Sequence, residues 1–277
     1  MSAAVFLLVL FAALCHAVWN AIVKAGDDTT LMAILVALAG AIISVVVLPF
    51  LAQPAPASWP FLAISTVLQV AYYLLVGSAY RASDMSRAYP LMRGTAPLIV
   101  AVVTAFALGD RLSPAAWIGV VLVSAGVVAT AFAAQGHGNR RGTLLALVNA
   151  VVIAAYTISD GLGVRASLSP VAYTMWLTVL TAAPLTVYAA VTRPDFTRQA
   201  IASAPLAFVG GALTLTSYGL ALWAMTVAPV AVVAALRETA ILFGTAIAVL
   251  VLHERISAPR LAAIAVIAAG AIALRLA

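Results

Sequence analysis

AYRASDMSRAYPLMRGTAPLIVAVVTAFALGDRLSP, residues 79–114, matches WAMTVAPVAVVAALRETAILFGTAIAVLVLHERISAP, residues 223–259, when the numbering is shifted by 144. The shift aligns Arg93 with Arg237 and Thr95 with Thr239, and each stretch ends in an acid–arginine pair shortly before a serine. An apolar chain whose second half repeats its first is typical of membrane proteins with a binding site between two structural repeats.

The composition predicts an all-α, polytopic membrane protein. The chain has 277 residues, of which 65% are hydrophobic and 8% charged, and its mean hydropathy is +1.17. No soluble domain of this length has enough interior for so much apolar surface. Because a helix needs roughly 20 apolar residues to cross a bilayer, ten transmembrane helices are expected, at residues 3–23, 30–51, 59–81, 86–108, 114–134, 142–163, 169–191, 201–224, 229–252 and 258–276.

Ten spans divide into a 5+5 inverted repeat. The polar, glycine-containing stretch QGHGNRRG, residues 135–142, separates the halves, so we expect one repeat over 1–138 and a second over 139–277 within one membrane domain. Five is an odd number, so the second repeat must enter the membrane in the opposite direction to the first, with a central cavity between them.

The basic residues predict the orientation. Nine of the 14 Lys and Arg fall on one side, three on the other, and two inside spans; the nine are Lys24, Arg81, Arg87, Arg140, Arg141, Arg193, Arg198, Arg255 and Arg260. The positive-inside rule places these nine in the cytoplasm of a bacterial inner membrane, and an even number of spans then places both termini outside.

Several classes of function are disfavoured. There is no basic cluster interleaved with aromatic residues, so no nucleic-acid partner is expected. No metal or other cofactor is expected either, since the three histidines, His16, His137 and His253, lie on separate elements and no phosphate-binding glycine loop is present. The sequence has no cluster of a nucleophile with its base that would indicate an enzyme. It also has no ring of like residues that would indicate a channel. The single cysteine, Cys15, excludes an intrachain disulfide.

Polar side chains recur on one face of six spans, the first, third, fourth, sixth, eighth and ninth, three from each half. Polar groups inside a bilayer are costly and usually face a cavity or a partner. The candidate substrate-binding residues are His16, Trp19, Asn20, Gln69, Tyr73, Tyr80, Arg93, Asn149, Tyr156, Ser217, Tyr218, Trp223 and Arg237, and Asp160 lies on the same stripe as Asn149 and Tyr156. The other four spans carry no comparable stripe.

Each of these residues also has a structural interpretation. Tyr80 and Trp223 are near helix ends and could be interface anchors, and Asn20 or Asn149 could join helices by hydrogen bonds. The arginines could pair with Glu238 or reach towards the nearest interface. Buried arginine and aromatic rings together suit a small zwitterion or anion with an apolar part. Inside the bilayer, arginine side chains are expected to outnumber acidic ones. This excess favours a zwitterionic or anionic cargo over a cationic one.

The whole chain resembles the drug/metabolite transporter superfamily of the EamA type. The segments that carry this resemblance are HAVWNAIVKAG from His16, YPLMRGTAPLIVA from Tyr89, and the turns GDRLSP and HERISAP. The resemblance implies ten helices around a central cavity and export of small molecules. Smaller relatives have a proton-coupling glutamate eight residues before a lysine in the first helix, where this chain has His16 before Lys24. We therefore take His16 and Glu238 as candidates for coupling. The family often has both termini in the cytoplasm, in conflict with the charge count.

The sequence thus predicts a secondary transporter that exports amino acids, including aromatic ones, and related metabolites by alternating access. The open alternative is a multidrug or lipophilic-cation exporter, or a flippase for lipid-linked substrates. The expected partners are a small-molecule substrate and membrane lipid, and the chain is expected to be a monomer or weak homodimer. Small residues such as Gly119, Gly126 and Gly270 suit close packing within the chain or with another copy.

Overall fold

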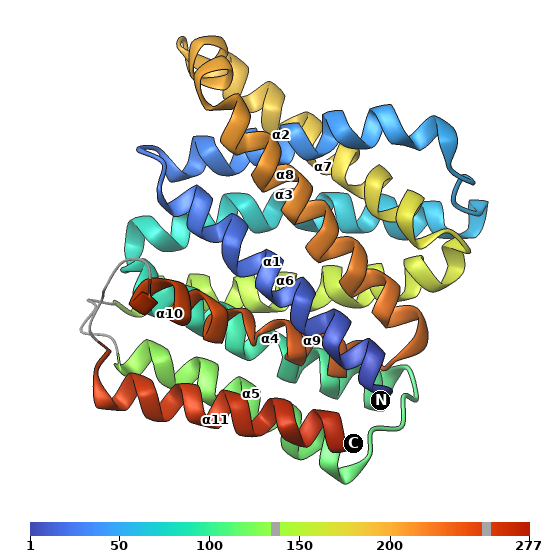
Figure 1. Cartoon of the computed structure of the whole chain (residues 1–277), viewed down its shortest axis with the longest axis vertical. Coiled ribbons are helices and arrows are strands. Elements are labelled where there is room, and N and C mark those ends of the chain that lie inside the picture. The colour runs from blue at the N-terminus through green and yellow to red at the C-terminus, as the bar shows by residue number, and fades with distance from the viewer. Residues whose placement is uncertain (134–138, 251–255) are drawn as a thin grey trace.

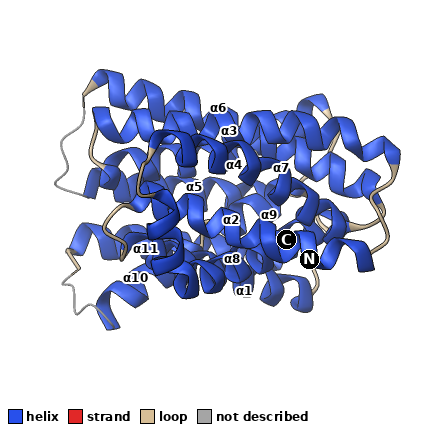
Figure 2. Ribbon diagram, turned by 90° about the horizontal axis from the view of Figure 1, so that it is seen from above, coloured by secondary structure: helices blue, strands red, loops and turns tan. Residues whose placement is uncertain are grey.

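The computed structural model describes residues 1–133, 139–250 and 256–277, and this part of the chain is helical without strands (Figures 1 and 2). The helices are α1 (Ala3–Lys24), α2 (Thr29–Val47), η1 (Leu48–Phe50), η2 (Pro56–Ser58), α3 (Trp59–Ala82), α4 (Met85–Ala107), α5 (Pro114–Ala133), α6 (Arg140–Ser167), α7 (Pro170–Thr192), α8 (Phe196–Val227), α9 (Val230–Arg237), α10 (Ala240–Leu250) and α11 (Ala258–Leu276). Within the described residues they make ten spans that are long and apolar enough to cross a membrane. Helices satisfy their own backbone hydrogen bonds, as lipid requires.

Polar residues in the connections start several helices. Asp28 Oδ1 accepts a hydrogen bond from the backbone N–H of Leu31 at 2.9 Å, and Asn139 Oδ1 accepts one from Gly142 at 2.7 Å. Ser113 caps α5 in the same way at 3.1 Å. Each cap satisfies a backbone donor that the first turn of a helix leaves free, so the chain turns back into the bilayer at these points.

The packing follows the two-fold repeat. The first helix of each repeat packs on the third helix of the other, α1 on α8 and α6 on α3, while α2 contacts α7 and α5 contacts α11. Both chain ends lie at the same end of the molecule (Figure 1), where the Arg275 guanidinium donates to the Met1 carbonyl at 3.0 Å. Ten spans with both ends together confirm the predicted 5+5 inverted arrangement. The boundary between 138 and 139 lies at the edge of the described residues.

The spans without polar stripes lie at the two ends of the long axis. In Figure 1, α5 and α11 form one end, and α2 and α7 lie near the other, with the remaining spans between them. The α5–α11 contact depends on glycine: a β-carbon on Gly126 would lie 2.6 Å from Ile267 and 2.9 Å from the Ala263 carbonyl oxygen. The small residues predicted to allow close packing therefore do so within the chain.

One predicted span is not a continuous helix. The helix expected over 229–252 ends at Arg237, and α10 begins at Ala240; residues 251 and 252 lie outside the described part. At the break, the N–H groups of Glu238 and Thr239 donate to carbonyls three residues back, and the Thr239 hydroxyl donates to the Leu236 carbonyl at 2.6 Å. These bonds replace the regular i to i−4 pattern, and the prediction of an unbroken helix is wrong at this point. The repeat at Glu254-Arg255 also falls outside the described residues.

Candidate functional site

A buried ion pair joins the two repeats at the helix break. Arg93 of α4 contacts Glu238 twice, from Nη2 to Oε1 at 2.8 Å and from Nε to Oε2 at 3.1 Å. Both side chains are buried. Two parallel bonds between a guanidinium and a carboxylate give a strong and directional contact. Glu238 lies at the interruption between α9 and α10, and its pairing with Arg93 is the structural alternative that the sequence offered for the arginines.

Arg237 is buried beside this pair but has a different partner. Its guanidinium carbon lies 4.9 Å from the centre of the Tyr218 ring, and the residue is 8% exposed. Across the described ranges 1–133, 139–250 and 256–277, the Arg237 side chain forms neither an ion pair nor a hydrogen bond with protein. A cation over an aromatic face is stabilised, yet its hydrogen-bond donors remain available to a ligand.

These charged groups line a small cavity. Its volume is about 10 Å³, which is the room that one water molecule needs. It is lined by Arg93, Ala96, Pro97, Val100, Ile153, Tyr156, Thr157, Ala234, Arg237 and Glu238. Both repeats contribute to the lining, so relative movement of the repeats would change its size. In this structure the space is too small for an amino acid.

Aromatic residues extend from the cavity towards α3. Tyr156 lines the cavity, and its ring centre lies 6.0 Å from that of Tyr72, which in turn lies 5.4 Å from Tyr73. In both pairs the rings meet edge to face, an attractive arrangement. Tyr72 was not among the predicted site residues although it neighbours Tyr73 in sequence.

Asp160 forms a second polar centre, outside the cavity lining. It is fully buried, and Tyr173 Oη donates to its Oδ1 at 3.2 Å, while Tyr218 Oη and Gln69 Nε2 donate to Oδ2, the latter at 3.3 Å. These contacts join α3, α6, α7 and α8. In the sequence, Asp160 stands out as an acid on the polar stripe of α6, but no role was predicted for it there.

The buried charges are balanced. Among the described residues, the buried charged side chains are the cations Arg93 and Arg237 and the acids Asp160 and Glu238. The expectation that arginine outnumbers acid at depth is therefore wrong, because Asp160 lies as deep as the other three. The site suits a ligand with both charges as well as an anion.

The α1 residues bond mainly to one another. Trp19 Nε1 donates to His16 Nδ1 at 3.2 Å, and Asn20 Nδ2 donates to the His16 carbonyl at 2.7 Å. Their side chains are partly buried and do not line the cavity. His16 Nδ1 is thus used as an acceptor, which leaves Nε2 for any further partner.

The remaining candidates lie apart from the cavity lining. Asn149 Nδ2 lies 3.3 Å from Met92 Sδ, and the Ser217 hydroxyl donates to the Ala12 carbonyl at 2.7 Å. Trp223 is 39% exposed. Tyr73 and Tyr80 pack at the edges of two separate apolar clusters. Three candidate residues, Arg93, Tyr156 and Arg237, line the cavity directly, and Tyr218 supports Arg237.

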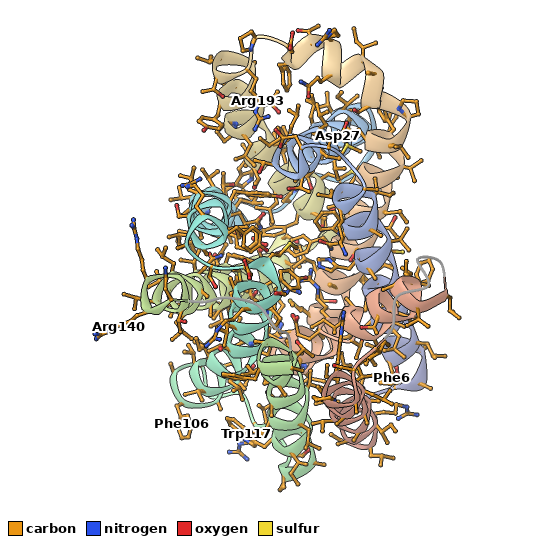
Figure 3. The ribbon with its side chains drawn as sticks, turned by 90° about the vertical axis from the view of Figure 1, so that its left-hand side faces the viewer. Phe6, Asp27, Phe106, Trp117, Arg140 and Arg193 are labelled. Atoms are coloured by element: carbon orange, nitrogen blue, oxygen red, sulfur yellow. The ribbon has the colours of Figure 1, made fainter. Side chains whose placement is uncertain are left out.

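Basic residues frame one end of the molecule. Figure 3 looks onto that end, where Arg140 projects outward and Arg193 lies near Asp27. The Arg193 guanidinium pairs with Asp28 and so ties the end of α7 to the start of α2. Partial burial raises the pKa of Asp28, but the hydrogen bonds from Arg193 and from the Leu31 and Thr30 N–H groups outweigh it, so this pKa lies below its usual value.

Comparison with known proteins agrees with this architecture. The model of the EamA-like transporter family matches residues 3–132 and again residues 140–276. A solved structure titled "Crystal structure of protein" is similar over 100% of this chain and 98% of its own, with a TM-score of 0.75 and 21% sequence identity, and supports the fold. No curated protein sequence matches the chain. The two family matches cover both five-helix repeats, and the chain therefore belongs to the EamA-like transporter family of multi-pass membrane transporters.

Proposed function

We propose that this transporter exports amino acids and related small metabolites across the bacterial inner membrane by alternating access. The observation that carries the proposal is the buried Arg93–Glu238 pair beside Arg237, at the contact between the repeats. An amino acid has one carboxylate and one ammonium group, so it can take the place of an internal ion pair without a change in net buried charge. Charges inside a membrane protein need such compensation.

The geometry suggests how cargo would be held. The cargo carboxylate would bind the free donors of Arg237 and compete with Glu238 for the fork of Arg93. Glu238, once released, would bind the ammonium group. Because the cavity is now the size of one water molecule, cargo entry requires the repeats to separate, as alternating access demands.

The aromatic rings support cargo with an apolar side chain. Tyr156 lines the cavity and Tyr72 stacks edge to face behind it. Rings of this kind bury aromatic and branched side chains and contribute about 0.5–1.5 kcal/mol beyond the area buried. Aromatic amino acids are therefore the first cargo to test.

The orientation follows from charge. We place the end with Lys24, Arg140 and Arg193 in the cytoplasm and both termini outside. Cysteine substitutions near each terminus, labelled with a membrane-impermeant reagent in whole cells, test this directly. We further propose that the functional unit is a monomer or a weak homodimer, since the glycine faces of α5 and α11 are used within the chain.

A lipophilic-cation exporter is the second candidate, because the buried acids Glu238 and Asp160 could compensate a permanent cation. A panel of labelled aromatic, branched, basic and acidic amino acids and one lipophilic cation, offered to proteoliposomes, separates the two. We expect saturable amino-acid flux in the wild type. Flux of the cation alone would replace the first proposal with the second.

The variant Arg237→Gln tests the binding role. Loss of one charge-assisted contact of about 1.5–3 kcal/mol predicts a fall in apparent affinity of about 10- to 100-fold. Arg198→Ala is the matched control, because the Arg198 side chain is 79% exposed and pairs with the nearby Asp195. Normal transport by a folded Arg237→Gln protein would contradict the assignment.

A further inference from the structure

Asp160 is a buried acid that the cargo cavity does not use. Its side chain is 0% exposed and is absent from the cavity lining. No Lys or Arg among residues 1–133, 139–250 and 256–277 pairs with it. An acid in this position is costly in a bilayer unless it pairs or serves an ion pathway. The burial of Asp160 without a paired cation in the described ranges therefore points to a role other than cargo binding.

All partners of Asp160 are neutral donors. Tyr173 donates from α7, Tyr218 from α8 and Gln69 from α3, and Gln69 Nε2 also lies 3.4 Å from Ser65 Oγ. The Ser65 hydroxyl is a further neutral donor to Asp160, and a carboxylate accepts all of these bonds. A protonated carboxyl group carries a donor on one oxygen and keeps its remaining acceptor capacity, so protonation changes the direction or the partner of a hydrogen bond at that oxygen.

The other charged and titratable groups near this centre are engaged elsewhere. Arg237, from α9, faces the ring of Tyr218 rather than the carboxylate. Arg93, from α4, is held by Glu238, and Tyr156, on the same helix as Asp160, faces the cavity. No guanidinium of the described residues thus holds Asp160 in its charged form, in contrast to Glu238, which makes two contacts with Arg93.

Tyr218 links the acid to the cargo site. Its hydroxyl donates to Asp160 while its ring lies under the Arg237 guanidinium at 4.9 Å. Movement of Tyr218 away from Asp160 would remove the support of Arg237. The proton state of the acid and the position of the proposed cargo-binding arginine are therefore mechanically connected through one side chain.

The position of Asp160 in the repeat adds a second, independent observation. Asp160 lies eight residues before Leu168, which directly follows α6, and His16 lies nine residues before Ala25, which directly follows α1. The two titratable side chains therefore occupy the same turn of equivalent helices that run in opposite directions. Such a pair could accept protons from opposite sides of the membrane.

We propose that Asp160 is the proton-binding site that couples cargo movement to a proton gradient in this transporter. A proton from water binds one Asp160 oxygen, the Tyr218 hydroxyl loses its acceptor and turns away, and Arg237 releases the cargo carboxylate. Loss of the proton on the opposite side restores the hydrogen bonds. The coupling role rests on the proposed export function, whereas proton binding by Asp160 does not.

Proton binding is tested without cargo. Infrared difference spectra of the protein in lipid nanodiscs, recorded from about pH 5 to about pH 8, detect carboxyl groups that exchange protons in that range. We expect a protonated-carboxyl band in the wild type and in Glu238→Gln that is missing in Asp160→Asn. A band that persists in Asp160→Asn, or no band in the wild type, would overturn the proposal.

A second variant covers the case in which Asp160→Asn does not fold. Tyr218→Phe keeps the ring under Arg237 and removes one donor to the carboxylate. Because that bond stabilises the charged form, the midpoint of the carboxyl band should move to higher pH. An unchanged midpoint would contradict the assignment of the band to Asp160.

Coupling is tested with labelled L-phenylalanine in proteoliposomes, with and without a pH gradient. The gradient should accelerate flux by the wild type and by Arg198→Ala, and should have no effect on Asp160→Asn. An undiminished response in Asp160→Asn, or a response to Na⁺ in place of protons, would refute the coupling role. If the wild type carries no amino acid, the export proposal fails while the infrared spectra still decide the proton site.

Discussion

The Arg93–Glu238 pair should be costly to break but dispensable for folding. At 2.8 Å and an effective dielectric constant of about 20, the attraction between the charges is about 6 kcal/mol. Removal of both ions from water costs several kcal/mol each. The two terms nearly cancel, so the intact pair adds little net stability.

Removal of one partner is different, because it leaves the other charge buried and unpaired. We expect Glu238→Ala to lower the free energy of unfolding by about 3–5 kcal/mol. The double variant Arg93→Met, Glu238→Leu fills the same space with apolar groups and should regain most of that loss, since such replacements are often neutral or stabilising. The double variant should nevertheless transport nothing, because the charges that would bind a zwitterion are gone.

Thermal unfolding in detergent and amino-acid flux in proteoliposomes, measured on the same preparations, check these expectations. The wild type and Arg198→Ala serve as references. A double variant no more stable than Glu238→Ala would show that the pair stabilises the fold outright. A double variant that still transports would show that the pair has no part in cargo binding.

Three further predictions concern stability. Gly126→Ala should destabilise the protein by about 1–3 kcal/mol through overpacking, because the added carbon would lie 2.6 Å from an α11 side chain. Gly244→Ala is the control, since a β-carbon there would have nothing within 4 Å, and it should not destabilise the protein. Equal melting temperatures of the two variants would refute this packing. Arg165→Met should cost about 1–3 kcal/mol, because the guanidinium donates to two carbonyls at the end of α8, at 2.8 and 3.1 Å; an unchanged melting temperature would count against it. The folded-state pKa of Asp28 lies below its usual value, so its contribution should be present at neutral pH and be lost as the pH falls below about 4. Asp28→Asn should therefore reduce the melting temperature at neutral pH but not in acid, and a difference that persists in acid would contradict the pairing with Arg193.

Composition and repetition in the sequence were sufficient for the architecture. Ten apolar runs, with an odd number in each half, predict an inverted repeat because each bilayer crossing reverses the chain. The polar stripes also predicted which spans lie between the α5–α11 and α2–α7 pairs, since polar groups avoid lipid. These properties depend on local composition and spacing, which a sequence displays directly.

The pairing of charges was decided only by the tertiary structure. Arg93 and Glu238 are separated by 145 residues, and they meet where the regular hydrogen bonding of α9 gives way to a turn at Glu238 and Thr239. Asp160 gained its donors from three other helices. Neither contact has a periodicity that could be read along the chain. The sequence by itself determined the number, direction and polar faces of the spans, and tertiary packing alone decided which buried arginine is neutralised, which remains available to a ligand, and which acid is left without a cation.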